Sequence, residues 1–295
     1  MHLWLNGRLV PRERARIRID DRGFHFGDGI FETLRVYGGE PFLLDEHWKR
    51  FVRHARLLRM PLPFDRETVR RAIALLVRRN RTPEGTVKFV VSRGVGGVSA
   101  GRGPWRPTAA VWLYPFTPLP ESIREAGVRV RISPWRQNAL GLVSHVKTLN
   151  YLERVFERET VRERGVWESI FLSTDGEIAE GTFTNVFGVR RGRVYTPRVE
   201  ARIRPGVTRQ VVLALCRRAG IPAAERRVSP RELKDADEVF LTHSPNEVVP
   251  VARIDGRRIG NGRPGPVTRL LMRAYRDEVK RRCGGPGGMS ESLSV

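Results

Sequence analysis

Short stretches of alternating apolar and polar residues predict strands along most of the chain. Residues 3–10 are predicted as a strand that ends in an Asn6-Gly7 turn, and Arg16–Ile19 alternates like a second strand. Ile30–Tyr37 is a third predicted strand, and Gly38-Gly39 follows it as a hairpin turn. The same pattern predicts further strands over 86–92, 109–114, 128–132, 238–242 and, as two strands about the Asp175-Gly176 turn, over 169–189.

Helical spacing of the apolar residues appears between these strands. Asp45 is a candidate N-cap for a helix that ends near Arg59, before Pro61. Asp65 is the candidate N-cap of a second helix, whose predicted buried face carries Val69, Ala72, Ile73 and Leu76. Later helices are predicted after the Lys147 segment and to about Arg164, over 207–219 before Gly220, and over 268–282.

Strands and helices alternate without a regular βαβ repeat, which favours an α+β fold with mixed sheets. We expect a small N-terminal domain over residues 1–118, a linker over 119–124 and a larger domain over 125–283. Residues 284–295 are rich in Gly, Ser and Pro, so a disordered tail is expected there.

The composition places the chain among globular proteins. Its 295 residues are 40% hydrophobic, and no apolar run reaches membrane-spanning length. The start, Met1–Gly7, is too quickly polar for a signal peptide, and Cys216 and Cys283 suggest neither a disulfide framework nor a metal cluster. The six histidines have no metal-ligand spacing, so no metal is expected. A cytoplasmic enzyme fits these features best.

The formal net charge of +22 allows two interpretations. One is a nucleic-acid-binding protein. The other is a general preference for arginine on solvated faces, and the scattering of the basic residues among Glu and Asp favours it. No zinc-finger or helix-turn-helix spacing accompanies the charge, so nucleic acid is the disfavoured partner. The charge should still attract anionic substrates and cofactors.

Lys147 is the strongest candidate for chemistry. The chain has only four other lysines, Lys49, Lys88, Lys234 and Lys280, and arginine supplies nearly all the remaining positive charge. A lysine can lose its proton and form an imine with an aldehyde, whereas arginine stays protonated.

Two further motifs have the polarity of a cofactor site. Arg204-Pro205-Gly206-Val207-Thr208 places free backbone N–H groups and a hydroxyl at a predicted helix start, where an anion such as phosphate is favoured. Glu180 lies in a strand of apolar and small residues, where a carboxylate requires a cationic partner. A protonated pyridine nitrogen would be such a partner.

In this order and spacing, Lys147, Glu180 and the Gly206-Val207-Thr208 turn resemble the class IV pyridoxal-phosphate-dependent aminotransferases, which have the two-domain fold of type IV. The resemblance runs from about Leu5 to Tyr275. Four further stretches agree with it: Asp21–Glu32, Glu46–Arg50, Asp237–Thr242 and Gly265–Thr268. The family contains branched-chain aminotransferases, D-amino-acid aminotransferases and 4-amino-4-deoxychorismate lyases.

The resemblance implies a role for each matching residue. Lys147 would bond covalently to pyridoxal 5′-phosphate, Glu180 would pair with the protonated ring nitrogen, and Tyr151 would contact the phenolic oxygen. The phosphate would be held by Arg50, Val207, Thr208 and Ser244. The substrate pocket would include Phe26, Phe31, Arg35, Lys88 and Arg93. The larger domain would then be the cofactor-binding one.

The substrate is left open by the sequence. Val87–Gly94 and Lys147–Asn150 look like the lyase branch, whereas Glu247–Val251 and Gly265–Thr268 look like the branched-chain branch. Pro245 stands where a branched-chain enzyme would use a backbone N–H, which proline lacks. We expect amino-group transfer between a branched-chain-like amino acid and a 2-oxo acid, with the lyase and D-amino-acid activities as alternatives. The resemblance also implies a homodimer or higher oligomer in which the 93–104 loop closes over the partner's site.

Overall fold

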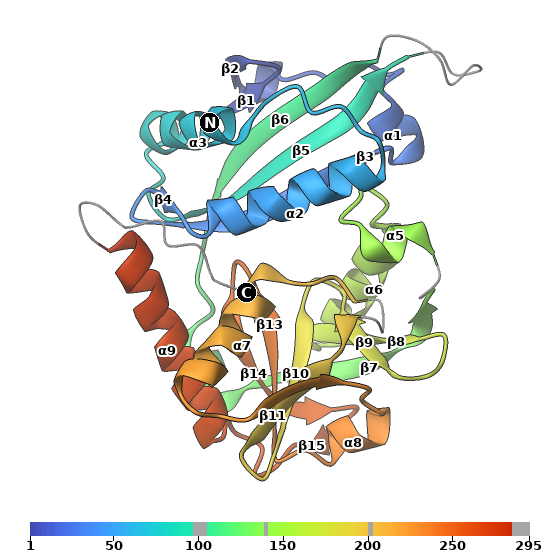
Figure 1. Cartoon of the computed structure of the whole chain (residues 1–295), viewed down its shortest axis with the longest axis vertical. Helices are drawn as coiled ribbons and strands as arrows, with labels where there is room; N and C mark the ends of the chain where they lie inside the picture. The colour runs from blue at the N-terminus through green and yellow to red at the C-terminus, as the bar shows by residue number, and fades with distance from the viewer. Residues whose placement is uncertain (97–104, 139–140, 200–202, 285–295) are drawn as a thin grey trace. The chain divides into compact units, whose positions relative to one another are not determined.

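The computed structural model describes residues 1–96, 105–138, 141–199 and 203–284, and it divides into two compact units. Unit 1 comprises Met1–Thr117, Val146–Asn150 and Val279–Val295, and unit 2 comprises Pro118–His145 and Tyr151–Glu278. Figure 1 labels the elements of both units. The predicted linker overlaps helix α4 (Glu121–Ala126), and the predicted domain boundaries stay predictions. The predicted tail lies outside the described residues apart from Gly284.

Unit 1 is built on a six-stranded antiparallel sheet of order β2-β1-β6-β5-β3-β4. Its strands are β1 (His2–Leu5), β2 (Arg8–Pro11), β3 (Gly29–Tyr37), β4 (Glu40–Pro41), β5 (Gly85–Val95) and β6 (Arg106–Pro115). The helical elements of this part are η1 (Arg12–Arg14), α1 (Arg22–Phe26), α2 (Leu44–Leu57) and α3 (Arg66–Asn80).

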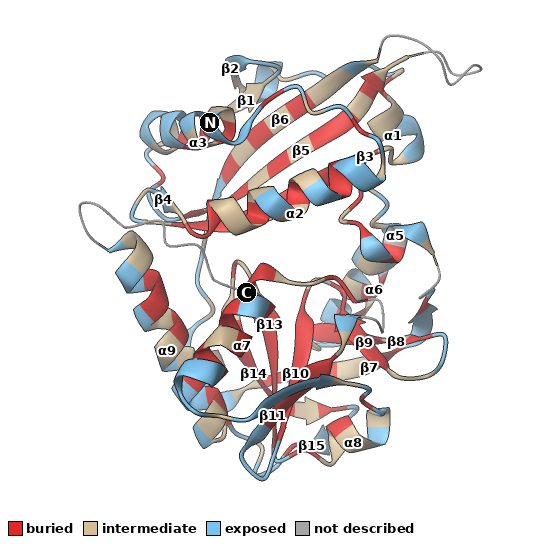
Figure 2. Cartoon of the chain, in the orientation of Figure 1, coloured by how far each residue is buried: buried red, intermediate tan, exposed pale blue. Residues whose placement is uncertain are grey.

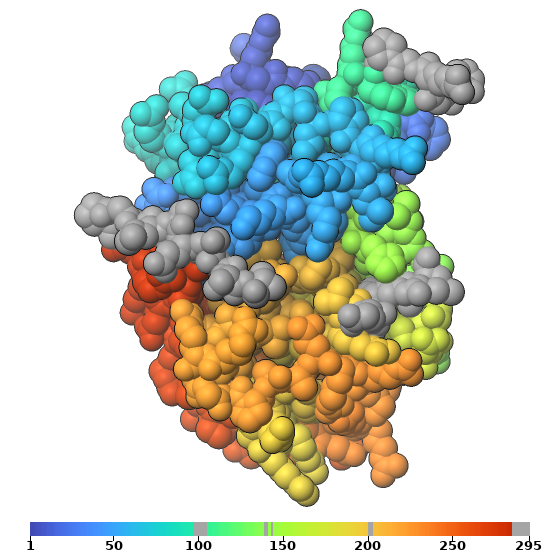
Figure 3. Space-filling model, viewed as in Figure 1, coloured from blue at the N-terminus to red at the C-terminus, as the bar shows by residue number. Residues whose placement is uncertain are grey.

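Helices α2 and α3 cover one face of this sheet (Figure 1). Buried and partly buried positions alternate along most of β5 (Figure 2), as expected for a strand with one face on a core. The core joins Ile30 and Leu34 of β3 and Phe89 of β5 to Phe51 of α2 and Ile73 of α3. The exposed positions of α2 and α3 are rich in arginine, and these helices lie at the surface in Figure 3.

Unit 2 is built on a nine-stranded mixed sheet of order β12-β11-β10-β13-β14-β7-β8-β9, with β15 beside β14. Its strands are β7 (Val128–Gln137), β8 (Glu168–Ser173), β9 (Ile178–Gly181), β10 (Asn185–Arg190), β11 (Arg193–Pro197), β12 (Ala223–Arg226), β13 (Glu238–His243), β14 (Glu247–Ile254) and β15 (Arg257–Arg258). Besides α4, its helices are α5 (Leu142–His145), α6 (Leu152–Glu163), α7 (Val207–Arg218), α8 (Pro230–Lys234) and most of α9 (Pro266–Cys283). Strand pairs β7–β8, β7–β14 and β11–β12 are parallel, and the other pairs are antiparallel. The predicted α+β class with mixed sheets is confirmed.

Several turns and one helix N-cap were predicted correctly from the types of their residues. Asn6 and Gly7 have positive φ between β1 and β2, and the Asp65 carboxylate accepts the Thr68 N–H at 2.8 Å as the N-cap of α3. The hairpin turn after β3 is also present, with both Gly38 and Gly39 in positive φ.

Two predictions of local structure were wrong. Arg16–Ile19 is not a strand, and Ile17 and Ile19 are exposed, because alternation without a neighbouring strand to pair with forms no sheet. Asp45 lies inside α2, where Leu43 is the N-cap, and it binds Arg66 instead. The helix predicted after the Lys147 segment is confirmed, since α6 runs from Leu152 to Glu163.

Candidate active site

Lys147 lies in a five-residue segment of unit 1, Val146–Asn150, that is held against β3. The Lys147 carbonyl accepts the Phe31 N–H at 3.0 Å, and Leu149 donates to the Gly29 carbonyl at 2.9 Å. The Lys147 N–H donates to Nδ1 of His54 on α2, at 3.4 Å. Backbone contacts on both sides of Lys147 therefore fix the point from which its side chain extends.

The Lys147 ammonium and a second lysine contact the same aromatic ring. Nζ of Lys147 lies 4.3 Å from the centroid of the Phe31 ring, and Nζ of Lys88 lies 4.2 Å from it. Lys88 is also 5.6 Å from the Trp112 ring centroid. Contacts of this kind stabilise an ammonium group at a partly buried position. The structure thus brings together three of the residues singled out in the sequence: Lys147, Phe31 and Lys88.

A buried carboxylate, Glu32, lies on the helix-covered side of β3. Arg50 of α2 donates to both of its oxygens at 2.7 Å, and His47 Nδ1 lies 2.8 Å from Oε2. Burial alone would raise the pKa of Glu32, but the Arg50 charge and the His47 contact hold that pKa well below its usual range. An ionised carboxylate only accepts, so Nδ1 of His47 is the donor.

The charge of Lys147 also affects the pKa of His47. Burial lowers the pKa of His47 first, Glu32 opposes that shift, and the positive charges of Arg50 and Lys147 lower the pKa further. His47 is therefore a neutral group at neutral pH. Arg50, which was predicted to hold a phosphate, has its Nε and one Nη on Glu32, and its phosphate role stays a prediction.

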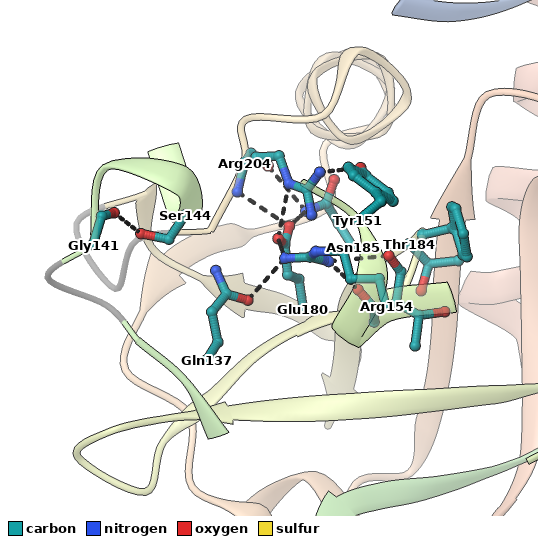
Figure 4. A network of polar contacts seen from close by, with 12 residues as sticks. Gln137, Gly141, Ser144, Tyr151, Arg154, Glu180, Thr184, Asn185 and Arg204 are labelled. Carbon is teal, nitrogen blue, oxygen red and sulfur yellow. Dashed lines mark hydrogen bonds and ion pairs between the residues drawn. The ribbon is translucent and has the colours of Figure 1, made fainter. Parts of the chain in front are cut away.

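In unit 2, Glu180 on β9 is the centre of a polar network, shown in Figure 4. Arg154 of α6 donates to its Oε1 at 2.6 Å, and Nε of Arg204 donates to the same oxygen at 3.1 Å. Oε2 accepts the Arg204 backbone N–H at 3.1 Å and the Asn185 amide at 3.3 Å. This buried carboxylate therefore has the cationic partners that its position requires.

The electrostatics of this network keep Glu180 ionised. Burial alone would raise the pKa of Glu180, but Arg204 and Arg154 outweigh it and hold the pKa below its ordinary value of 4.5. Tyr151, which was predicted to contact the cofactor, joins the network through a hydrogen bond from Arg204 to its hydroxyl. The centroid of its ring lies 5.6 Å from the centroid of the Phe183 ring. Tyr151 and Glu180 thus share one cation, Arg204.

The start of helix α7 is the second part of the unit 2 site. Gly206 is its N-cap and provides no side-chain hydrogen bond to the first turn. A Cβ at Gly206 would overlap the side-chain oxygen of Asn185, so only glycine fits there. The Thr208 hydroxyl, one residue after Val207, donates to Ser244 Oγ at 3.4 Å. The predicted residues Val207, Thr208 and Ser244 therefore lie together at a helix N-terminus, which favours an anion.

Three other predicted pocket residues, Arg35, Arg93 and Phe26, each contact their own set of neighbours. Arg35 is buried and pairs with Glu84 at 2.9 Å. The Arg93 guanidinium donates to Asp28 at 2.9 Å and to backbone carbonyls at the end of α2. Phe26 is half-exposed at the end of α1. These contacts lend no support to a substrate role for Arg93 or Phe26, which stay predictions.

Sequence reasoning missed the cationic partners of Glu180. Arg154 and Arg204 are 26 and 24 residues from Glu180 in the chain, and each is one of many arginines. The requirement for a cation beside Glu180 was visible, but nothing in the spacing selected which arginines supply it. The Glu32–His47–Arg50 contacts were not predicted either, although the apolar residues around Glu32 in the sequence are a signal that its carboxylate needs a partner.

The chain is similar in sequence to proteins of known family. The family model "Amino-transferase class IV" matches residues 29–254. A Methanocaldococcus jannaschii protein provisionally named a branched-chain-amino-acid aminotransferase is 35% identical over 94% of this chain and 96% of its own. The D-alanine aminotransferase of Bacillus licheniformis is 34% identical over 95% of this chain and 97% of its own.

Solved structures share the fold. The branched-chain aminotransferase of the archaeon Thermoproteus uzoniensis with norvaline has a TM-score of 0.87 and 30% identity, over 95% of this chain and 94% of that one. Another solved branched-chain amino acid aminotransferase, 32% identical with a TM-score of 0.85, contains pyridoxamine 5′-phosphate.

Enzymes of the matching family depend on pyridoxal phosphate and act on amino and oxo acids. Within the described residues, no helix is long and apolar enough to cross a membrane. Because the family model spans well over half of the sequence, the chain belongs to the class IV aminotransferases.

Proposed function

We propose that this chain binds pyridoxal 5′-phosphate through Lys147 and transfers an amino group between a branched-chain-like amino acid and a 2-oxo acid. The observation that carries the proposal is the fixed position of Lys147, held by backbone hydrogen bonds to β3 and to His54 beside the Phe31 ring. A covalent bond to a cofactor aldehyde needs an amine, and Lys147 supplies one at a defined place.

The start of α7 fits the phosphate of this cofactor. Its first N–H groups lack a side-chain cap, and the hydroxyls of Thr208 and Ser244 lie beside it. Val207 opens the helix, so its N–H is one of the donors available to an anion. We assign the phosphate to this helix start, with Arg50 as the predicted additional cation.

Glu180 fits the ring nitrogen. Pairing with a protonated pyridine nitrogen requires an ionised carboxylate, and Arg154 and Arg204 keep Glu180 in that form. When bound, the cofactor supplies an electron sink for the substrate carbon that loses its proton. Glu180 would hold the ring proton in place, Tyr151 would orient the phenolic oxygen, and the Lys147 amine would take and return the substrate proton.

Borohydride trapping tests the cofactor assignment. Protein incubated with pyridoxal phosphate should develop an absorbance band at the visible–ultraviolet border, which borohydride should bleach while fixing the cofactor on Lys147. Peptide mapping then identifies the modified lysine, with Lys147→Ala as the unlabelled control. Fixation on Lys88 would contradict the assignment. If no band forms, a salt-dependent mobility shift with DNA tests the nucleic-acid alternative.

Two alternative activities call for the same assay. The identity to a D-alanine aminotransferase favours a D-amino-acid donor as the first alternative, and the sequence of Lys147–Asn150 favours the lyase as the second. Amino transfer to 2-oxoglutarate from L-leucine and from D-alanine, beside pyruvate release from aminodeoxychorismate, separates the three. Faster turnover of L-leucine is the expected result.

We also propose a homodimer in the cytoplasm. Helix α6 carries Leu152, Val155 and Phe156 on one face at helical spacing, and Leu152 is 82% exposed. An exposed apolar stripe of this kind is typical of a surface that a second copy covers. The 93–104 loop was predicted to close over the partner's site; Arg93–Val95 belong to β5, and residues 97–104 lie outside the described residues.

A further inference from the structure

Lys88 and Lys147 project from the same face of the unit 1 sheet. Phe31 of β3 lies between them, with Lys88 on the neighbouring strand β5 and Lys147 in the segment on the other side of β3. The antiparallel bridge of Ile30 with Thr148 sets Lys147 beside Phe31. The register of β3 with β5 sets Lys88 opposite Thr33, two residues from Phe31 and therefore on the same face. The fold itself thus places two ammonium groups near one ring.

The two ammonium groups are close enough to repel each other. Their nitrogens lie 4.3 and 4.2 Å from the same ring centroid, and so at most about 8.5 Å apart, which is about one Debye length at physiological salt. The Phe31 ring stabilises each ammonium, which makes the arrangement tolerable. The repulsion favours loss of a proton, because it disappears when either lysine becomes neutral.

Several ionisable groups near Lys147 in unit 1 are paired or neutral. On the helix-covered side, the negative charge of Glu32 is paired with the positive charge of Arg50. Burial lowers the pKa of His47, so it adds no positive charge at neutral pH. Nδ1 of His54 accepts the Lys147 N–H and is therefore unprotonated. Lys88 adds a positive charge from the opposite face of the sheet.

We propose that Lys88 is a positioning residue that lowers the proton affinity of Lys147 and so increases the neutral amine available for reaction. This inference rests on the proposed role of Lys147 as the cofactor lysine. A like charge about 8 Å away at an effective dielectric constant of about 30 lowers a pKa by about one unit, which raises the neutral fraction about tenfold. A catalytic lysine beside a second cation is a recognised way of activating the amine.

Competitive labelling with acetic anhydride measures this effect without any cofactor. The full-length chain is labelled over a pH series, and mass spectrometry compares the label on Lys147 with that on Lys49, an exposed lysine of α2. In Lys88→Met and Lys88→Gln the pKa of Lys147 should rise by about one unit. Lys88→Arg keeps the charge and should leave that pKa within a few tenths of a unit of the wild-type value.

Arg53→Met is the matched control, because it removes one positive charge from an exposed position of α2. It should leave the pKa of Lys147 unchanged. An unchanged pKa in both neutral Lys88 variants, or an equal rise in Arg53→Met, would overturn the proposal. Circular dichroism and melting curves identify any variant that misfolds, and Lys88→Gln is the polar substitute for Lys88→Met. Borohydride trapping reports separately on cofactor binding, so the two hypotheses fail independently.

Discussion

Replacing Glu180 by glutamine separates its proposed chemical role from its structural one. The substitution keeps the shape of the side chain but removes the negative charge between Arg154 and Arg204. These side chains are 12% and 10% exposed, so the two guanidiniums would be left facing each other with little solvent. Breaking a buried ion pair by removing one partner costs about 3–5 kcal/mol. The retained amide still accepts hydrogen bonds, so we expect a loss at the lower end of that range, about 3 kcal/mol.

Thermal unfolding tests the structural part. About 3 kcal/mol corresponds to a fall in Tm of about 5 °C, because the entropy of unfolding is about 2.1 cal/mol/K per residue over 295 residues. Glu232→Gln is the matched control, because its partner Arg226 and Glu232 itself are about 40% exposed and such pairs contribute about 0–1 kcal/mol. A similar fall in Tm for both variants would show that burial of the Glu180 pair does not matter.

The stability difference should also depend on pH. The folded state lowers the pKa of Glu180 below 4.5, so the ionised carboxylate stabilises the fold at pH values above the unfolded pKa. That contribution is lost as the pH falls from about 4.5 through the lowered folded value. The gap between wild type and Glu180→Gln should therefore be full at neutral pH and narrow below that point. A gap that widens on acidification would refute the assigned direction.

Turnover tests the chemical part. Loss of one group that stabilises developing charge costs about 10²–10³ in rate. We expect pyridoxal phosphate still to bind Glu180→Gln, because the α7 contacts are unchanged, while amino transfer falls by that factor. Near-wild-type transamination at a temperature where the variant is folded would refute the ring-nitrogen role, whatever the change in Tm.

Two further predictions concern the phosphate site and the oligomer. Gly206→Ala should weaken pyridoxal phosphate binding and lower stability by about 1–3 kcal/mol, because its Cβ would displace Asn185. Gly141→Ala is the control for a glycine loss, because its φ is not positive and an added Cβ there makes no contact shorter than 3.4 Å. Equal cofactor affinity in Gly206→Ala and wild type would contradict the assignment. Light scattering at micromolar concentration should give at least a dimer, and mixing Lys147→Ala chains with chains mutated in the 93–104 loop should restore part of the activity; a fully active monomer would contradict this.

The fold was largely predictable where local chemistry determines it. The Asp65 cap and the Asn6-Gly7 turn depend on residues within a few positions of one another, and both predictions are confirmed. The Asp45 cap failed although the residue type was right, because Leu43 takes the left-handed conformation that starts α2. Such a choice depends on how the chain arrives from β4, which the spacing of residues does not encode.

The candidate site was predictable as a set of residues but not as a set of contacts. Glu180 needed a cation because its neighbours in sequence are apolar and small. The cations that supply it, Arg154 and Arg204, come from α6 and from the loop before α7, and only the folded chain brings them to β9. Lys88 was predicted as a pocket residue, but its contact with the ring beside Lys147 depends on strand register.

Four of the many arginines have a structural role inside the fold. Arg50, Arg154, Arg204 and Arg209 each bind a carboxylate from a position that is little exposed. Arginine suits such positions, since its planar guanidinium spans two acceptors and stays charged when buried. These ion pairs cancel in the net charge of +22, which therefore comes from the other basic residues of the chain. Lysine has the opposite property, because its proton affinity responds to its surroundings. Two of the five lysines, Lys88 and Lys147, contact the Phe31 ring, where a change in protonation would be of use to the reaction.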